Sequence, residues 1–596
     1  MTTPIWFGPT DRPLFGFFHT PAGGAGRAGA VICPPFDRDY LHGHYALRLL
    51  AEQLADQGIS VVRFDYDGTG DSAGSPDDPD RVASWLGSVE AALDVVRDAG
   101  ATTTVLIGMR IGATLAGEVA ARLGNVDGLV LWDPVVSGKA YLTEQRALNA
   151  LSFGDVPTAD DGSVDTPGRR FDATTVADLR DVDLTTTAGP LAKRVLVMAR
   201  PEKPANRLAK RLDLPHVDWS EATGQAGLMD TGSPNQILPL DDIAAVADWV
   251  SSVVPDRTQP VVVPPAAADA VVGRTPQGTA IVETPVALGP AGLFGVVTDA
   301  PGRTAGPTAV FLNVANEHRL GPARLWVDLA RRWAESGIRS VRVDLSGLGD
   351  SPTRHPDQRR FVTRAPEAFD DVIDICRAVS PADPGNVVLF GLCASAYQAL
   401  DSAFDVVPRG VVSVNPILSF LPPEIAAGSD LDPRRHVAIV RNTAMQSFHG
   451  TGRLSVLRDK FPRLAVHGRE VAESLEALMA PPQRRPAAWL KKLTTSGVDV
   501  LVICGDREAR PIKLSGTAWS FRRLTRTGRY RLELIRGLEH GLLIADQRAH
   551  VAQLMSDHMA ALASRPVPTA DAGFSLAGAG TPPQPRRLPP AKVFLA

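Results

Sequence analysis

One long unit occurs twice in the sequence, and this repeat constrains the fold more than any other feature. LFGF at 14–17 recurs as LFGV at 293–296, a shift of 279 residues. The same shift carries FDYDGTGDS at 64–72 onto VDLSGLGDS at 343–351. Two distant matches at one shift indicate duplication, and a period this long excludes a solenoid. We therefore expect two whole domains in tandem.

Changes in composition suggest the boundaries of these domains. We place the N-terminal domain at 1–253 and the C-terminal domain at 271–565. Residues 254–270 are rich in Pro and Ala, which is typical of a linker. Residues 566–596 are rich in Pro, Gly and Ala, so we expect a disordered tail. A chain of 596 residues accommodates two large domains of this kind.

Within each copy, short apolar runs alternate with amphipathic helical stretches. In the second copy the strand-like runs are 308–313, 340–345, 386–390, 411–415 and 498–504. Helical spacing separates them at 323–337 and 369–379. Strands that alternate with helices predict an α/β fold, in which a mostly parallel sheet has helices on both faces. In such sheets ligands bind beyond the carboxyl ends of the strands.

The strongest candidate nucleophile is Cys393. It stands in GLCAS at 391–395, between an apolar strand and a helix. This is the pattern of the G-x-S-x-G turn, with cysteine in the place of serine. Most free cysteines are buried packing residues, and Cys33, Cys376 and Cys504 have no context beyond that. The turn around Cys393 favours a nucleophile instead.

A nucleophile needs a base, and the base needs an orienting partner. His540 follows the strand-like run 531–535, and Asp506 follows 498–504. The order Cys393, Asp506, His540 is the nucleophile, acid, base order of α/β hydrolases. Glu508 and Asn415 remain open as alternatives for the acid position. The oxyanion hole would use the backbone N–H groups of Ala394 and Ala315.

Two motifs in the second copy resemble those of a family of bacterial α/β hydrolases. That family has N-A-G-x-E-H-R-x-G-P-x-R in its first loop and G-L-C-S-G-A at its elbow. Here they read NVANEHRLGPAR at 313–324 and GLCASA at 391–396. The resemblance implies an α/β-hydrolase domain with a cysteine active site. His318 and Arg319 are then candidates for binding a substrate carboxylate or a phosphopantetheine phosphate, with capping of the following helix as the alternative.

The first copy resembles a sister group of hydrolase-like proteins. It has four of their motifs: CPPF at 33–36, RFDYDGTGDSAG at 63–74, GMRIGA at 108–113 and LWDPVV at 131–136. This resemblance implies acyl thioester substrates, carried on an acyl carrier protein or coenzyme A.

The two copies differ where the chemistry would occur. Aligning them places Cys393 on Arg110, Asp506 on Pro201 and His540 on Ala226. Arginine stays protonated in proteins and cannot serve as a nucleophile. We therefore expect the N-terminal domain to be inactive, with Arg110 paired to Asp133. The insertion at about 416–497 of the second copy is expected to form a lid.

Charge and composition exclude several other classes. Lys+Arg is 62 against Asp+Glu 66, so there is no basic excess of the kind that nucleic-acid binders show. No apolar run reaches the roughly 20 residues of a membrane helix, and no signal peptide is apparent. Four scattered cysteines without a CxxC pair fit the cytoplasm. We expect no cofactor. We also expect no metal, because the paired aspartates stand in a D-x-x-G-x-G-D-S motif, which forms a structural turn at a corner of this fold (a corner turn).

Together these features predict a cysteine-dependent acyl hydrolase or acyltransferase that acts on a thioester through an acyl-Cys intermediate. Two alternatives stay open. One is a binding or scaffold protein without catalysis, and the other is an esterase or lactonase for small molecules.

Overall fold

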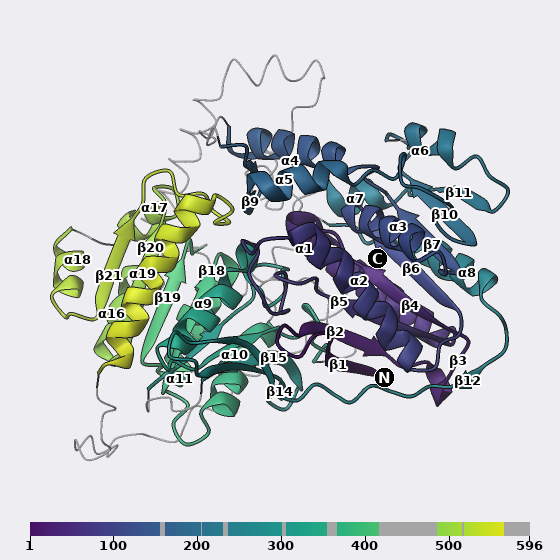
Figure 1. Ribbon diagram of the computed structural model, residues 1–596. Coiled ribbons are helices and arrows are strands. Elements are labelled where there is room, and N and C mark those ends of the chain that lie inside the picture. The colour runs from purple at the N-terminus through teal and green to yellow at the C-terminus, as the bar shows by residue number, and fades with distance from the viewer. Residues whose placement is uncertain are drawn as a thin grey trace, which may run out of the picture.

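The fold was analysed in a computed structural model, which describes 1–154, 161–203, 205–230, 236–300, 306–354, 366–416, 486–514, 516 and 518–565. The expected lid at 416–497 lies outside the described residues except at its two ends, and the expected disordered tail at 566–596 lies outside them entirely. Two large sheets occupy the two halves of the chain (Figure 1).

The first sheet has eight strands in the order β1-β2-β5-β4-β6-β7-β10-β11. The strands are β1 (Thr2–Phe7), β2 (Leu14–His19), β4 (Ala28–Cys33), β5 (Ile59–Phe64), β6 (Thr104–Met109), β7 (Gly128–Trp132), β10 (Arg194–Ala199) and β11 (Val217–Glu221). β1 and β2 are antiparallel to their neighbours, and the other pairs are parallel. The residues of β4, β5 and β6 are buried along the whole length of each strand, as expected for parallel strands covered on both faces.

Helices cover both faces of this sheet. One face packs against α1 (Asp37–Asp56), α7 (Gln225–Met229) and α8 (Leu240–Val253). The other packs against α2 (Arg81–Asp98), α3 (Ile111–Leu123), α4 (Gly138–Phe153) and α5 (Ala173–Asp181). The remaining elements are α6 (Asn206–Arg211), the hairpin β8 (Val164–Thr166) and β9 (Arg169–Phe171), the 3-10 turn Ala22–Gly24, and the small pair β3 (Ala25–Gly26) and β12 (Gln259–Pro260).

The second sheet has the same order with one added edge strand: β13-β14-β15-β17-β16-β18-β19-β20-β21. Its strands are β13 (Ala270–Arg274), β14 (Ala280–Leu288), β15 (Leu293–Asp299), β16 (Thr308–Phe311), β17 (Ser340–Val343), β18 (Val387–Leu392), β19 (Gly410–Val414), β20 (Asp499–Cys504) and β21 (Tyr530–Leu534). The repeat in the sequence is therefore a repeat of the fold.

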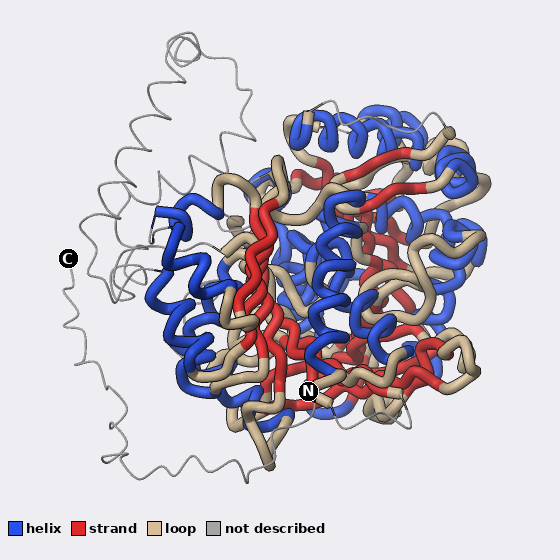
Figure 2. The backbone as a smooth tube through the Cα atoms, turned by 90° about the vertical axis from the view of Figure 1, so that its left-hand side faces the viewer, coloured by secondary structure: helices blue, strands red, loops and turns tan. Residues whose placement is uncertain are grey.

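This sheet also lies between two helical layers. α9 (Leu325–Glu335), which the 3-10 turn Pro322–Arg324 precedes, covers one face with α19 (Ala545–Ala563). The other face packs against α10 (Pro366–Val379), α11 (Ala394–Val406), α16 (Pro486–Thr495), α17 (Ala509–Leu514) and α18 (Ala518–Thr525). Figure 2 shows the strands in the interior with helices on both sides.

The antiparallel edges of the two sheets meet at the centre of the molecule. The rings of Phe17 on β2 and Phe294 on β15 are 5.2 Å apart, and both strands lie near the middle of Figure 1. The carboxyl ends of β18, β19, β20 and β21 all meet at one edge of the second sheet, because these strands are parallel. The candidate catalytic residues follow these ends.

Candidate active site

Cys393 lies on a tight turn between β18 and α11. Its backbone has φ 61° and ψ −113°, a conformation that costs a non-glycine residue about 1–3 kcal/mol and is concentrated at active sites. The Cys393 N–H donates to the Val414 carbonyl at 3.0 Å, which joins the turn to β19. A Cβ at Gly391 would lie 2.3 Å from the Ser395 carbonyl, so only glycine fits there. Cys393 therefore lies on a strained strand-to-helix turn.

Ser395 stands where the resembled family has glycine. Its side chain is buried, and its hydroxyl lies 3.1 Å from both the N–H and the carbonyl oxygen of Leu392. The hydroxyl is thus hydrogen-bonded inside the turn, and the elbow accommodates the larger residue.

His540 brings Cys393 and an acid together. Its Nδ1 lies 3.1 Å from Glu508 Oε1, and its interaction with the Cys393 thiol contributes to its raised pKa. Burial alone would lower the pKa of His540, but the hydrogen bonds to Cys393 and Glu508 outweigh it and raise the pKa to about 10. Burial likewise opposes the shift of Glu508, yet His540 holds the pKa of that carboxyl below its usual value. An imidazolium beside the sulfur favours the reactive thiolate.

The carboxylate in contact with His540 is Glu508, whereas the sequence predicted that Asp506 would take this position. β20 ends at Cys504 and α17 begins at Ala509. In the turn between them, the Asp506 side chain is exposed, whereas the Glu508 side chain is only 10% exposed and contacts His540. The sequence offered both carboxylates, and only the path of this turn distinguishes them.

Asn415, the other open alternative, supports the site without acting as an acid. Its Nδ2 donates to the carbonyls of His540 at 2.9 Å and Glu539 at 3.2 Å. Its Oδ1 accepts the Gly505 N–H at 3.1 Å. Asn415 thus joins the loop that carries the histidine to the turn that carries the acid.

The two predicted oxyanion donors lie in suitable backbone positions. Ala394 is the first residue of α11, and the N–H groups of a first helical turn have no partner within the helix. Ala315 lies in the loop after β16 and has a left-handed backbone with φ 48°. Their role in binding an oxyanion remains a proposal.

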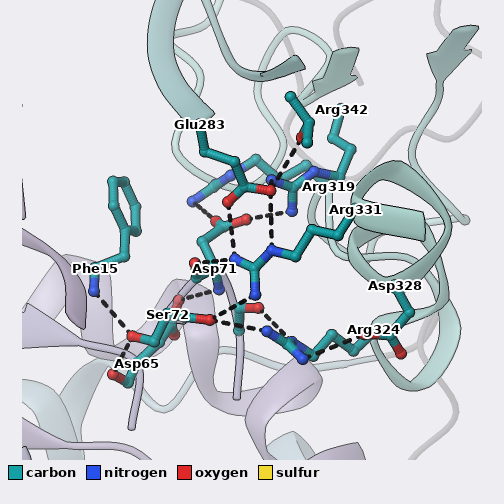
Figure 3. A network of polar contacts seen from close by, with 12 residues as sticks. Phe15, Asp65, Asp71, Ser72, Glu283, Arg319, Arg324, Asp328, Arg331 and Arg342 are labelled. Carbon is teal, nitrogen blue, oxygen red and sulfur yellow. Dashed lines mark hydrogen bonds and ion pairs between the residues drawn. The ribbon is translucent and has the colours of Figure 1, made fainter. Parts of the chain in front are cut away.

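His318 and Arg319 are not available to a substrate, which corrects their assignment as candidate substrate-binding residues. Arg319 is 2% exposed and lies 2.6 Å from Asp71 (Figure 3). It also lies 2.8 Å from Asp344 and 2.9 Å from Asp350. The His318 ring stacks on the His44 ring with centroids 4.2 Å apart. Both side chains are buried in the interface between the domains.

The paired aspartates of the corner turns belong to the same interface. Arg342 Nη1 lies 2.6 Å from Asp71, and Arg331 donates to the Asp71 carbonyl at 2.7 Å (Figure 3). Within the described part of the chain, no group of three or more His, Cys, Asp or Glu side chains could hold a metal ion. The two corner turns thus contribute buried ion pairs to the contact between the domains.

In the N-terminal domain, the equivalent turn keeps its backbone shape and carries Arg110 at the position of Cys393. Arg110 has φ 57° and ψ −124°, close to the backbone angles of Cys393. Its guanidinium lies 3.1 Å from Asp39, 3.3 Å from Asp133 and 2.6 Å from Glu144. The predicted pairing of Arg110 with Asp133 is confirmed, and Arg200 adds a further contact to Asp133 at 2.7 Å. Buried ion pairs fill the position of an active site.

Comparison with known proteins agrees with this architecture. Residues 42–196 match the family model described as serine aminopeptidase, S33 (Hydrolase_4). Both halves of the chain have the α/β-hydrolase fold. The family match supports a hydrolase activity for this chain. Since the matched residues contain Arg110 at the elbow, the match leaves the nucleophile of the C-terminal domain open. No curated protein matches the chain.

Several solved structures are similar to parts of the chain. Est1E from Butyrivibrio proteoclasticus with bound ferulic acid has 16% identity and a TM-score of 0.34, and the match covers 42% of this chain and 98% of Est1E. A hydrolase from Agrobacterium vitis has 20% identity and a TM-score of 0.31, covering 43% and 99%. The Pyrococcus furiosus esterase Pf2001 has 14% identity and a TM-score of 0.31, covering 42% and 93%. Among the described residues, no helix is long and apolar enough to span a membrane.

Proposed function

We propose that the C-terminal domain is a cysteine-dependent acyl hydrolase or acyltransferase that acts on acyl thioesters through an acyl-Cys393 intermediate. The strongest support is His540, which lies 3.1 Å from Glu508 and whose pKa is raised by its interactions with Cys393 and Glu508. Nucleophile, base and orienting acid in this order are the arrangement that acyl transfer requires.

In the first half-reaction, the Cys393 thiolate attacks the carbonyl carbon of the donor. A carbon–sulfur bond forms, and the carbonyl oxygen becomes an oxyanion that accepts hydrogen bonds from the N–H groups of Ala394 and Ala315. Such donors contribute about 3–4 kcal/mol each where they have been removed. The tetrahedral intermediate collapses, the bond from carbon to the leaving sulfur breaks, and the leaving thiolate takes the proton from His540.

In the second half-reaction, neutral His540 accepts a proton from water or from another nucleophile as it attacks the acyl-Cys393 carbonyl. The Cys393 thiolate then leaves, and the ion pair with His540 is restored. A cysteine suits thioester donors because the donor and the acyl-enzyme have similar energies. The resemblance of the N-terminal domain favours a donor carried on coenzyme A or on an acyl carrier protein. Nucleic acids and membranes are not part of the proposal.

The test is the mass of the intact protein after incubation with short-chain acyl coenzyme A thioesters. Wild type is expected to gain one acyl group, and Cys393→Ala is expected to gain none. His540→Ala should acylate slowly, because its thiol lacks the imidazolium. Cys504→Ala is the matched control, since Cys504 is a fully buried cysteine at the end of β20 and should acylate like wild type.

Other outcomes would favour the alternative functions. An adduct with p-nitrophenyl esters but with no thioester would favour a small-molecule esterase. An absence of adducts with every donor, together with slow alkylation of Cys393, would favour a binding or scaffold protein and reject the proposal.

A further inference from the structure

A hairpin of the inactive domain touches the loop that carries the candidate catalytic histidine. The hairpin consists of β8 and β9, and its tip is Pro167–Gly168. The N–H of Gly168 donates to the carbonyl of Leu543 at 3.1 Å, three residues beyond His540. Figure 1 shows β9 at the boundary between the two domains. A backbone hydrogen bond thus joins the two halves of the chain close to the candidate active site.

One arginine connects the hairpin tip and the histidine loop. Arg548, in the first turns of α19, donates from Nη2 to the Gly168 carbonyl at 2.8 Å. From Nη1 it donates to the carbonyls of Leu542 at 3.0 Å and Leu543 at 3.3 Å. A single guanidinium therefore binds carbonyl groups of both domains.

The loop that Arg548 holds has a backbone that needs support. Leu542, two residues after His540, has φ 57°, which is unfavourable for a leucine. The Glu539 carboxylate accepts the N–H groups of Gly541 and Leu543, both at 2.7 Å, so the loop is also closed from within. A conformation of this kind persists only where its surroundings fix it.

The hairpin itself is firmly attached to the inactive domain. Arg169 lies 2.9 Å from Asp37, and both side chains are largely buried. Phe171 is 2% exposed and packs against Trp85 and Tyr141. At the tip, Gly168 has φ 103°, and a Cβ there would lie 3.2 Å from Ala323 Cβ. The tip is thus a rigid support, shaped to fit the second domain.

We propose that the β8–β9 hairpin of the inactive domain positions His540, with Arg548 as the positioning residue that joins them. The role of His540 in this inference rests on the proposed function. It gives the catalytically inactive domain a role in the active site, because the histidine loop is held from outside its own domain. Arg548 does not touch the reacting atoms and acts through the carbonyls on both sides of it.

The test compares Arg548→Met with Arg48→Met in the full-length protein. Arg48 is a matched control, because it also donates across the domain boundary, to the carbonyls of Gly349 at 2.8 Å and Ser351 at 3.2 Å, away from the histidine loop. Two measurements are made: the pH profile of Cys393 alkylation by iodoacetamide, and hydrogen exchange of the amides at 541–543. Neither measurement requires a substrate.

We expect Arg548→Met to alkylate about 10-fold more slowly at pH 7, because a displaced His540 no longer pairs with the sulfur. Its alkylation should rise only at higher pH, and exchange at 541–543 should be faster. Arg48→Met should match wild type in both measurements. Arg548→Lys, which keeps one donor, should recover part of the rate and serves as the second variant if Arg548→Met does not fold.

Three results would overturn the inference. The first is a wild-type alkylation profile in Arg548→Met, the second is an equal change in Arg48→Met, and the third is no recovery in Arg548→Lys. Failure of the proposed function has a different signature: wild type and His540→Ala would alkylate at the same rate, whatever happens to exchange at 541–543.

Discussion

Arg63 and Asp350 form an ion pair across the domain boundary, with 2.9 Å between Arg63 Nη2 and Asp350 Oδ1. The counterpart pair is Arg342 and Asp71, at 2.6 Å. A shift of 279 residues carries Arg63 onto Arg342 and Asp71 onto Asp350, so the two pairs are equivalent. Each copy binds the corner turn of the other in the same way. This reciprocity is the mark of an isologous dimer interface, here contained within one chain.

The interface predicts a large effect of Asp71→Asn on stability. Asp71 is fully buried and lies 2.6 Å from both Arg319 and Arg342. Removing its charge takes one carboxylate partner from each of two buried guanidinium groups, and breaking a buried ion pair typically costs about 3–5 kcal/mol. Urea unfolding followed by circular dichroism measures the difference.

The control for Asp71→Asn is an exposed ion pair of the same domain. Arg122 and Glu90 lie 2.5 Å apart with side chains 47% and 36% exposed. Arg122→Gln should change the free energy of unfolding by less than about 1 kcal/mol. Equal and small effects of both variants would show that the buried network does not stabilise the interface.

The fold and the elbow were accessible from sequence for physical reasons. The duplication is visible because the corner motif needs its glycines: at Gly70 and Gly349 a Cβ would collide with Asp65 and Asp344. The elbow is visible because Gly391 faces backbone at 2.3 Å. Such positions tolerate few residue types, so their pattern survives in both copies.

The rest of the site depends on contacts that lie far apart in sequence. Asp506 and Glu508 differ only in which way a short turn directs them. The sequence alone makes Arg319 a candidate for binding substrate, whereas in the structure Arg319 pairs with Asp71 of the other copy. A signal for this interface exists in the sequence: arginines and aspartates that recur at the repeat shift, namely Arg63 with Arg342 and Asp71 with Asp350. Reading them as pairs requires knowing that the copies face each other.

Replacement of the acid should distinguish the two carboxylates after β20. Glu508→Gln removes the charge that orients His540 and stabilises its protonated form, so acylation of Cys393 should slow by about 100-fold or more. Asp506→Asn alters an exposed side chain and should remain within about two-fold of wild type. Rates of acyl-adduct formation by mass spectrometry test both variants, and a reversed order would restore Asp506 as the acid.

The pKa of His540 predicts how Cys393 responds to pH. Hydrogen bonds to Cys393 and Glu508 outweigh burial and raise this pKa from an ordinary 6.5 to about 10. His540 should therefore stay protonated through pH 7–9, and its charge should keep alkylation of Cys393 faster than in His540→Ala over that range. In His540→Ala the rate should climb with pH, as it does for an ordinary thiol. Equal pH profiles would contradict the ion pair.

The raised pKa of His540 also affects the stability of the fold. A histidine whose pKa is higher in the folded state than in the unfolded state stabilises the fold fully below the unfolded value. The contribution of His540 should therefore be complete below about pH 6.5 and be lost as pH rises through about 10. Comparing the unfolding of wild type and His540→Gln at pH 6 and pH 10 measures it, and a difference that grows with pH would contradict the assignment.

Replacement of Arg110 should change the stability of the N-terminal domain without changing the reactivity of Cys393. Arg110→Met leaves Asp39, Asp133 and Glu144 without the guanidinium that contacts all three. We expect a loss of about 3–5 kcal/mol in the free energy of unfolding, with no change in the rate of Cys393 alkylation. Arg97→Gln, which alters a more exposed pair with Asp94, is the control and should have little effect.

Arg110→Cys should lose the same stability without gaining activity. A thiol at the elbow would have no base, since the position that corresponds to His540 is Ala226, on the short helix α7. The acyl adduct measured by mass spectrometry should therefore remain at one group per chain. A second adduct in Arg110→Cys would show that the inactive domain retains a functional oxyanion site. A near-wild-type stability of Arg110→Met would show that the ion pairs fill the old site without supporting the fold.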